Sequence, residues 1–148
     1  MTLTLHDIKV WNTGEVIDLI VPSDADKTVD ASAMTIAPGF EDPHVHFRDP
    51  GQTYKESMVS GCAAAASGGY TNVLIMPNTV PAMDGVKVTA GEPGASEALD
   101  AGFATVIDYL QHYEQAPDVT LPVRYDLCVC ASQGRAGQEA TGGAAWIG

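Results

Sequence analysis

The sequence predicts an α/β protein in two parts, because the pattern of apolar residues changes once along the 148-residue chain. Residues 3–36 read as short strands separated by turn signals, which favours a small β layer. From residue 37 onwards, strand-like runs alternate with helix-like runs, and this alternation is typical of a parallel sheet with helices packed on it. We therefore expect a small β domain at residues 1–36 and an α/β domain at residues 37–148.

Three short strands are expected in the first part. The first covers residues 3–10 and the second residues 16–21, with the turn signal Asn12-Thr13-Gly14 between them. A third strand is predicted at residues 29–36. Short strands of this kind are expected to pair antiparallel, which leaves the outer strands of the layer as exposed edges.

The second part is predicted to begin with a strand at about residues 40–47. Thr53 followed by Glu56 three residues later fits a capping box, so Thr53 is the predicted N-cap of the first helix. Apolar residues continue at helical spacing to Ala66, and Gly68-Gly69 is the predicted end of this helix.

Two more strands and one more helix are expected after that glycine pair. Residues 71–76 form a continuous apolar run ended by Pro77, which predicts a strand buried on both faces. Residues 123–129 are the predicted third strand. Between them, a single helix is predicted from one apolar stripe at helical spacing, formed by Leu99, Phe103, Val106, Ile107, Leu110 and Tyr113.

Composition excludes several classes of partner. The net charge is −12 with only seven Lys and Arg, so the chain lacks the basic patch that nucleic-acid binding requires. No apolar run approaches the roughly 18 residues of a membrane-spanning helix, and the N-terminus has no basic start of a signal peptide. Three cysteines, an odd number, favour free thiols in a reducing compartment, so we expect a cytoplasmic protein.

Residues 38–50 carry the strongest chemical signal. His44 and His46 are two residues apart in a predicted strand, where side chains at i and i+2 share one face, so both imidazoles could reach one metal ion. Asp42 and Arg48 are predicted on that same face. A metal beside an arginine fork suits a substrate that carries a hydrolysable group and a carboxylate. The alternative interpretation is two ordinary strand histidines.

The segment at residues 42–51, D-P-H-V-H-F-R-D-P-G, resembles the metal-binding signature that opens the barrel of dihydroorotases, within the amidohydrolase superfamily. The resemblance is strong over residues 30–85 and weak elsewhere. Further matches follow in the order and spacing of that family, at Lys55-Glu56, at the helix from Ser60-Gly61 to Gly68-Gly69, and at Met76-Pro77-Asn78-Thr79.

This resemblance implies a fold, a cofactor and a set of site residues. The fold is the N-terminal part of a (β/α)8 TIM barrel, preceded by a small and incomplete β-sandwich layer, with residues 37–148 supplying the first three βα units. The cofactor is zinc, as one or two ions, with His44 and His46 as metal ligands. His46, Arg48 and Asn78 are the implied substrate-binding residues. The general base and the remaining ligands are expected beyond residue 148, so no catalytic residue is expected in this chain.

The implied activity is the reversible interconversion of N-carbamoyl-L-aspartate and dihydroorotate in pyrimidine (UMP) biosynthesis. The implied partner is therefore a small-molecule substrate, one of these two compounds. A complete barrel needs about 250 residues, and residues 137–148 end without a closing element, so we expect an inactive fragment. Two alternatives stay open, a cyclic amidase of the allantoinase or hydantoinase type and a non-catalytic amidohydrolase-like partner protein. A homo-oligomer or a complex with other enzymes of the pathway is also left open.

Overall fold

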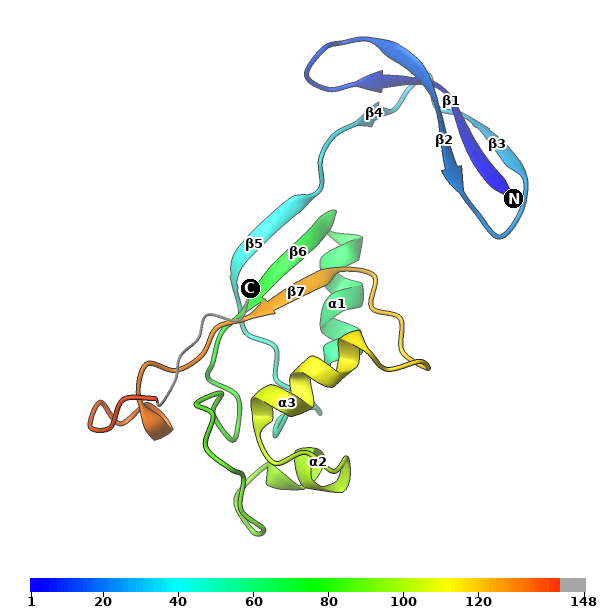
Figure 1. Ribbon diagram of the computed structural model, residues 1–148. Helices are drawn as coiled ribbons and strands as arrows, with labels where there is room; N and C mark the ends of the chain where they lie inside the picture. The colour runs from blue at the N-terminus through cyan, green and yellow to red at the C-terminus, as the bar shows by residue number, and fades with distance from the viewer. Residues whose placement is uncertain (142–148) are drawn as a thin grey trace. The chain divides into compact units, whose positions relative to one another are not determined.

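The computed structural model describes residues 1–141 and divides the chain into two compact units, Met1–Pro38 and Gly39–Gly148 (Figure 1). The predicted absence of a closing element at the end of the chain falls largely on residues 142–148, which lie outside the described residues. Among residues 1–141, no helix is both long enough and apolar enough to cross a membrane.

The first unit is one mixed sheet built around a central strand. Strand β1 (Thr2–Val10) lies between β2 (Val16–Pro22) and β3 (Lys27–Asp30), and the short β4 (Thr35–Ile36) also pairs with β1. The β1–β2 pair is antiparallel, whereas β3 and β4 run parallel to β1. The expectation of wholly antiparallel pairing is therefore wrong. After β2 the chain crosses to the other edge of β1, and there β3 and β4 run in the same direction as β1.

The predicted single strand at residues 29–36 is also wrong. Its polar residues make local hydrogen bonds that interrupt the strand, since the Asp30 Oδ1 atom accepts from the Ser32 backbone N–H at 3.0 Å. The Met34 N–H then donates to the Ala31 carbonyl oxygen at 2.8 Å. Asp side chains commonly capture a backbone N–H two residues ahead in this way and so favour a turn over a strand.

The second unit is a three-stranded parallel sheet with helical connections. The strand order is β5 (Phe40–Val45), β6 (Tyr70–Ile75) and β7 (Arg124–Leu127). Helix α1 (Met58–Ser67) connects β5 to β6, and helices α2 (Ala95–Asp100) and α3 (Val106–Gln111) lie in the β6–β7 connection (Figure 1). The 3-10 turns η1 (His112–Glu114) and η2 (Gln133–Arg135) complete the elements, and the predicted α/β class is confirmed for this unit.

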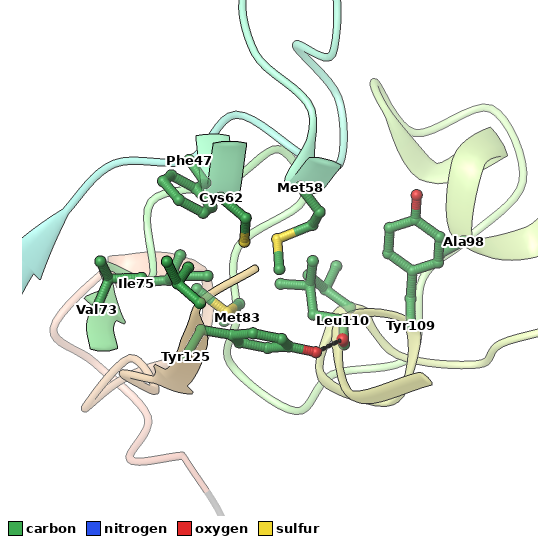
Figure 2. Packing of buried hydrophobic residues seen from close by; sticks show 12 residues of the cluster. Phe47, Met58, Cys62, Val73, Ile75, Met83, Ala98, Tyr109, Leu110 and Tyr125 are labelled. Atoms are coloured by element: carbon green, nitrogen blue, oxygen red, sulfur yellow. Dashed lines mark hydrogen bonds between the residues drawn. The ribbon is translucent and has the colours of Figure 1, made fainter. Parts of the chain in front are cut away.

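The core of the second unit lies between one face of this sheet and helices α1 and α3. Figure 2 shows Met58 and Cys62 of α1, Ile75 of β6, Leu110 of α3 and Tyr125 of β7 within one cluster. Full burial of a large apolar side chain contributes roughly 1.5–3 kcal/mol. The packing of this cluster therefore holds the helices against the sheet. The other face carries polar residues such as Asn72 and Asp126, and no described helix covers it.

The N-cap of helix α1 lies four residues later than predicted. Ser57 is the N-cap, and it forms a capping box with Ser60 in which each side chain accepts from the backbone N–H of the other. Thr53 instead donates its hydroxyl proton to the Glu97 Oε1 atom at 2.7 Å. The Thr53 hydroxyl, predicted from the capping-box pattern to cap the helix, thus bonds a residue 44 positions later in the sequence. The predicted end is correct, with Gly68 as the C-cap.

The single helix predicted from the stripe at residues 99–113 is divided into α2, α3 and η1. Gly102 adopts φ +86°, a left-handed conformation that ends the first helix. Thr105 then starts the next one, because its hydroxyl oxygen accepts from the Asp108 N–H at 3.1 Å. Most of the predicted stripe still reaches one core, through Phe103, Val106 and Leu110, but Leu99 is exposed and its neighbour Ala98 is buried instead.

Strand β5 ends at Val45, two residues earlier than predicted, and it carries an irregularity in its pairing. The Asp42 Oδ1 atom accepts from the His44 N–H at 3.0 Å, and the register with β6 shifts between Asp42 and Val45. Asp42 is paired with Val73, which is buried in the core beneath the sheet. The simple alternation that placed Asp42 on the histidine face is therefore wrong at this point.

Candidate metal centre

The two histidines meet at the carboxyl end of β5. His44 lies in the strand and His46 is the first residue after it, and their Nε2 atoms are 3.2 Å apart. The rings are arranged edge to face, with centroids 5.0 Å apart and an interplanar angle of 71°. Both side chains are exposed to solvent. The lone-pair edges of two imidazoles therefore converge on one accessible point.

Asn78 fixes the orientation of the second ring. It lies in the loop after β6, the neighbouring parallel strand, and its Oδ1 atom is 2.7 Å from His46 Nδ1. An amide oxygen can only accept, so the Nδ1 atom carries the proton and donates it. In a neutral imidazole the Nε2 atom of His46 then holds a free lone pair, which is the state that a metal ligand requires.

The separation of the two nitrogens suits a shared zinc ion. Two nitrogen ligands at roughly 2.0–2.1 Å from a tetrahedral zinc ion lie about 3.3 Å from each other. The observed 3.2 Å is close to that spacing. The same distance also suits a hydrogen bond between the rings when no ion is bound. The donor set therefore fits zinc, as two ligands of a site that requires at least one or two more.

Arg48 is half-buried and lies three residues beyond the end of β5. Within residues 1–141, its guanidinium makes no hydrogen bond or ion pair, and the structure does not bring it into hydrogen-bonding contact with the histidines or with Asn78. Its backbone is held in a turn, since its carbonyl oxygen accepts from the Gln52 N–H at 2.9 Å. Five guanidinium donors thus stay available to a ligand.

Sequence reasoning missed a buried carboxylate directly after Arg48. Asp49 is only 2% exposed, and its Oδ1 atom accepts from the Tyr109 hydroxyl at 2.9 Å. Its Oδ2 atom accepts from the Met58 N–H at 3.1 Å and from the Tyr113 hydroxyl at 3.2 Å. Two tyrosines spaced four apart on a predicted helix were the available signal, but nothing local connects them to a residue some sixty positions earlier.

The remaining histidines lie elsewhere. His6, on β1 of the first unit, is exposed, and its Nδ1 atom is 2.6 Å from Asp18 Oδ1. This hydrogen bond, with further help from Asp7, raises the pKa of His6 above 6.5. His112 is half-buried and stacks on Phe103 at 4.8 Å between ring centroids, so it packs against an aromatic side chain and not near the His44–His46 pair. No described residue adds a third protein ligand to the His44–His46 pair.

A parallel α/β unit with two neighbouring imidazoles at the carboxyl end of its first strand is an arrangement that suits a metal-assisted hydrolase. Residues 35–125, well over half of the chain, match the model of the amidohydrolase family, and the chain belongs to this family. That assignment confirms the hydrolase class predicted from the sequence.

Several curated proteins are similar to parts of this chain. A dihydroorotase of Sulfurihydrogenibium sp. (strain YO3AOP1) is 58% identical over 62 residues, which cover 42% of this chain and 15% of that protein. A dihydroorotase of Geobacter metallireducens is 46% identical over 89 residues, covering 51% and 21% respectively. One of Anaeromyxobacter sp. (strain K) is 44% identical over 105 residues, covering 71% and 23%.

These matches confirm the predicted resemblance to dihydroorotases. They also define its extent, because the chain spans less than a quarter of the length of each of these relatives.

Proposed function

We propose that this chain is the N-terminal portion of a zinc-dependent cyclic amidohydrolase of the dihydroorotase type. The complete protein would hydrolyse the ring amide of dihydroorotate to N-carbamoyl-L-aspartate and catalyse the reverse ring closure with loss of water, in pyrimidine biosynthesis. Residues 37–148 would form the first part of a (β/α)8 barrel, and residues 1–36 part of a small β-sandwich. The free state of all three cysteines supports a cytoplasmic location.

One observation carries this proposal, namely the 3.2 Å separation of the His44 and His46 Nε2 atoms with the His46 Nδ1 proton held by Asn78. Metal-ligating histidines usually donate their second ring N–H to an oxygen acceptor, which fixes the tautomer and the ring. His44 and His46 would hold zinc, which as a bound Lewis acid polarises a carbonyl and activates water. Arg48, Asn78 and His46 would contact the substrate.

Arg48 would decide the class of substrate. Its guanidinium is free of protein partners in the described chain, and a planar fork of donors matches a carboxylate in a bidentate manner. Dihydroorotate carries such a carboxylate beside its ring, whereas neutral cyclic amides such as dihydrouracil do not. The Asn78 Oδ1 atom is occupied by His46, so the amide N–H₂ group is the part of Asn78 left for a ligand.

A second candidate applies to residues 1–148 alone, which would be a non-catalytic amidohydrolase-like protein. The observation behind it is that no third ligand joins the histidine pair within residues 1–141. We expect purified chain of this length to show no dihydroorotase activity even with added zinc, because removal of a general base alone typically costs about 10²–10⁴-fold. Turnover by this chain that disappears in His44→Ala would contradict the expectation.

The test of the proposed function compares two substrates in the complete protein. In Arg48→Met, which keeps much of the side-chain volume, we expect dihydroorotate hydrolysis to lose on the order of 2–5 kcal/mol of transition-state stabilisation. Zinc content should stay unchanged, and hydrolysis of dihydrouracil should fall little or not at all. Activities on both substrates and zinc per chain are the measurements.

A matched control is Arg124→Met. Arg124 is an exposed arginine at the amino end of β7, opposite to the strand ends that carry His46 and Asn78, and its loss should leave both activities intact. Equal losses on the two substrates in Arg48→Met would remove the carboxylate role. A protein that prefers the neutral ring from the outset would instead support an allantoinase or hydantoinase type of amidase.

A further inference from the structure

The loop that carries Arg48 is attached to the rest of the second unit through a buried acid. Asp49 accepts three hydrogen bonds, from the Tyr109 hydroxyl, the Tyr113 hydroxyl and the Met58 N–H. Met58 is the first residue of α1, whereas the tyrosines come from α3 and η1 in the β6–β7 connection. One carboxylate therefore joins three separate elements next to Arg48.

The two tyrosines can act only as donors to this carboxylate. Burial is the main cause that raises the pKa of both hydroxyls, so each keeps its proton. Their oxygens are 3.1 Å apart, and each directs its single proton to a different oxygen of Asp49. No lysine, arginine or histidine among residues 1–141 pairs with Asp49. A buried carboxylate without a cation depends on such donors, because an unsatisfied one is strongly destabilising.

A second acid from the same connection holds the continuation of the loop. Glu97 on α2 accepts from the Thr53 hydroxyl at 2.7 Å and also from the Gly51 N–H. The two acids thus fix residues 49–53 at both ends. Since Tyr109, Tyr113 and Glu97 all belong to the β6–β7 connection, that connection acts as a clamp on the loop after β5.

The clamp also reaches the loop that carries Asn78. An added Cβ atom at Gly51 would lie 1.9 Å from the Val80 carbonyl oxygen, and one at Gly94 would lie 2.0 Å from the same oxygen. Both glycines have positive φ, at +92° and +75° respectively. The backbones of the two loops and of the start of α2 are therefore packed as closely as glycine permits.

We infer that Asp49, held by Tyr109 and Tyr113, is a positioning residue that fixes the backbone of Arg48 relative to Asn78 and the histidine pair. This inference rests on the proposed function and deepens it, since it names what orients the carboxylate-binding group. Among residues 1–141 no side chain pairs with the Arg48 guanidinium, so its position depends on the backbone that Asp49 holds. A displacement of a substrate-binding group by about 1 Å can cost on the order of 10²-fold in rate.

The test removes the two hydroxyls and keeps the rings. In the complete protein, Tyr109→Phe/Tyr113→Phe is compared with Tyr125→Phe. The buried Tyr125 hydroxyl belongs to the same core but donates to the Leu110 carbonyl oxygen, at 2.5 Å, and not to Asp49 (Figure 2). We expect hydrogen exchange of the Gly51 and Met58 amides to rise about tenfold or more in the double variant only, because hydrogen bonds to a charged group are stronger than those between neutral groups and both tyrosine donors to Asp49 are lost.

The kinetic measurement separates positioning from simple stability. We expect KM for dihydroorotate to rise on the order of tenfold in the double variant, with zinc content and dihydrouracil hydrolysis near wild type. Tyr125→Phe should lower the melting temperature without changing KM. If the double variant does not fold, Tyr113→Phe alone, at the more exposed tyrosine, gives the same comparison at smaller amplitude. Unchanged exchange at Gly51 and Met58 would overturn the inference regardless of activity.

Failure of the inference and failure of the proposed function give different results. If Arg48→Met raises KM for dihydroorotate but Tyr109→Phe/Tyr113→Phe does not, Asp49 has no positioning role and the inference is wrong. If neither change affects dihydroorotate selectively, the carboxylate role of Arg48 is wrong, and with it the proposed substrate. If both variants raise KM for dihydroorotate and not for dihydrouracil, the positioning role of Asp49 is supported.

Discussion

Each unit of this chain contains a histidine close to other ligand-type side chains, and the two groups differ in what their ring nitrogens contact. In the first unit, both nitrogens of His6 face carboxylates, with Nδ1 2.6 Å from Asp18 and Nε2 3.4 Å from Asp7. In the second unit, His46 directs Nδ1 to the neutral amide oxygen of Asn78 and Nε2 to another imidazole.

The difference shows that proximity of donor atoms does not define a metal site. Two carboxylates around one ring favour the imidazolium form, which raises the pKa of His6 and removes the lone pair that a metal requires. A neutral acceptor on one nitrogen favours a single tautomer and leaves the other nitrogen free. The His6 group of the first unit is thus an ion pair, and the His44–His46 pair of the second unit is the metal candidate.

The sharpest way to break this comparison is to delete each histidine in turn. We expect His46→Ala and His44→Ala to lower zinc affinity of the complete protein on the order of 10²–10³-fold, if the ~10–16 kcal/mol of a four-ligand zinc site is shared among its ligands. His6→Ala should leave zinc affinity unchanged. Competition with a chromophoric chelator measures all three variants, and a loss of zinc in His6→Ala would reverse the assignment.

Loss of Asn78, the hydrogen-bond partner of His46, should lower zinc affinity less than loss of either histidine. Asn78→Ala removes the acceptor of the His46 Nδ1 proton, so we expect zinc affinity to fall by about 10–100-fold, as is usual for such partners. The matched change in the first unit is Asp18→Asn, which removes the strongest partner of His6 and should not alter zinc binding. Equal zinc affinities of Asn78→Ala and wild type would mean that the hydrogen bond to His46 does not orient a ligand.

The local part of the second unit was predictable from sequence, because short-range patterns determine it. The β-branched run at residues 71–76 and the glycine pair after Ala66 lie within one residue of the observed ends of β6 and α1. The approach of Asn78 to His46 was also foreseeable, since carboxyl ends of neighbouring parallel strands lie at the same edge of a sheet. These features depend on residues that are close in sequence or in adjacent strands.

The supports of the loop after β5 were not predictable, because their partners are distant in sequence. Thr53 fits a capping box by its spacing, yet its hydroxyl bonds Glu97, and only the folded β6–β7 connection brings that acid within reach. Asp49 reads as a turn residue before proline, while its three donors come from α1, α3 and η1. Thr53 and Asp49 thus form hydrogen bonds with residues distant in sequence and not with the local partners that the sequence pattern suggests. A single sequence does not indicate which distant residues will pair.

The loop after β5 packs closely against the backbone of Val80 at Gly51, and the glycine of the first unit, Gly14, has no such contact. Gly51→Ala would place a Cβ atom 1.9 Å from the Val80 carbonyl oxygen, so we expect a loss of about 1–3 kcal/mol of unfolding free energy. Gly14 also has positive φ, at +72°, but an added Cβ would meet only Lys9 Cε at 3.9 Å. Gly14→Ala therefore reports backbone strain alone. Urea unfolding of both variants gives the difference, which vanishes if the loop near Val80 can move aside.

The smallest expected effect is the titration of His6. Its pKa is raised above 6.5, chiefly by the hydrogen bond to Asp18, so its interaction stabilises the fold fully below the unfolded pKa and is lost as pH rises through the folded pKa. Asp18→Asn should move the NMR titration midpoint of the His6 ring back toward 6.5, and Asp7→Asn should move it less, since Asp7 contributes a smaller charge interaction. Both residues are exposed, so added salt should reduce the shift as well. If the midpoint of Asp18→Asn equals that of wild type, the His6–Asp18 ion pair does not form, His6 keeps a free nitrogen at neutral pH, and the contrast with His46 disappears.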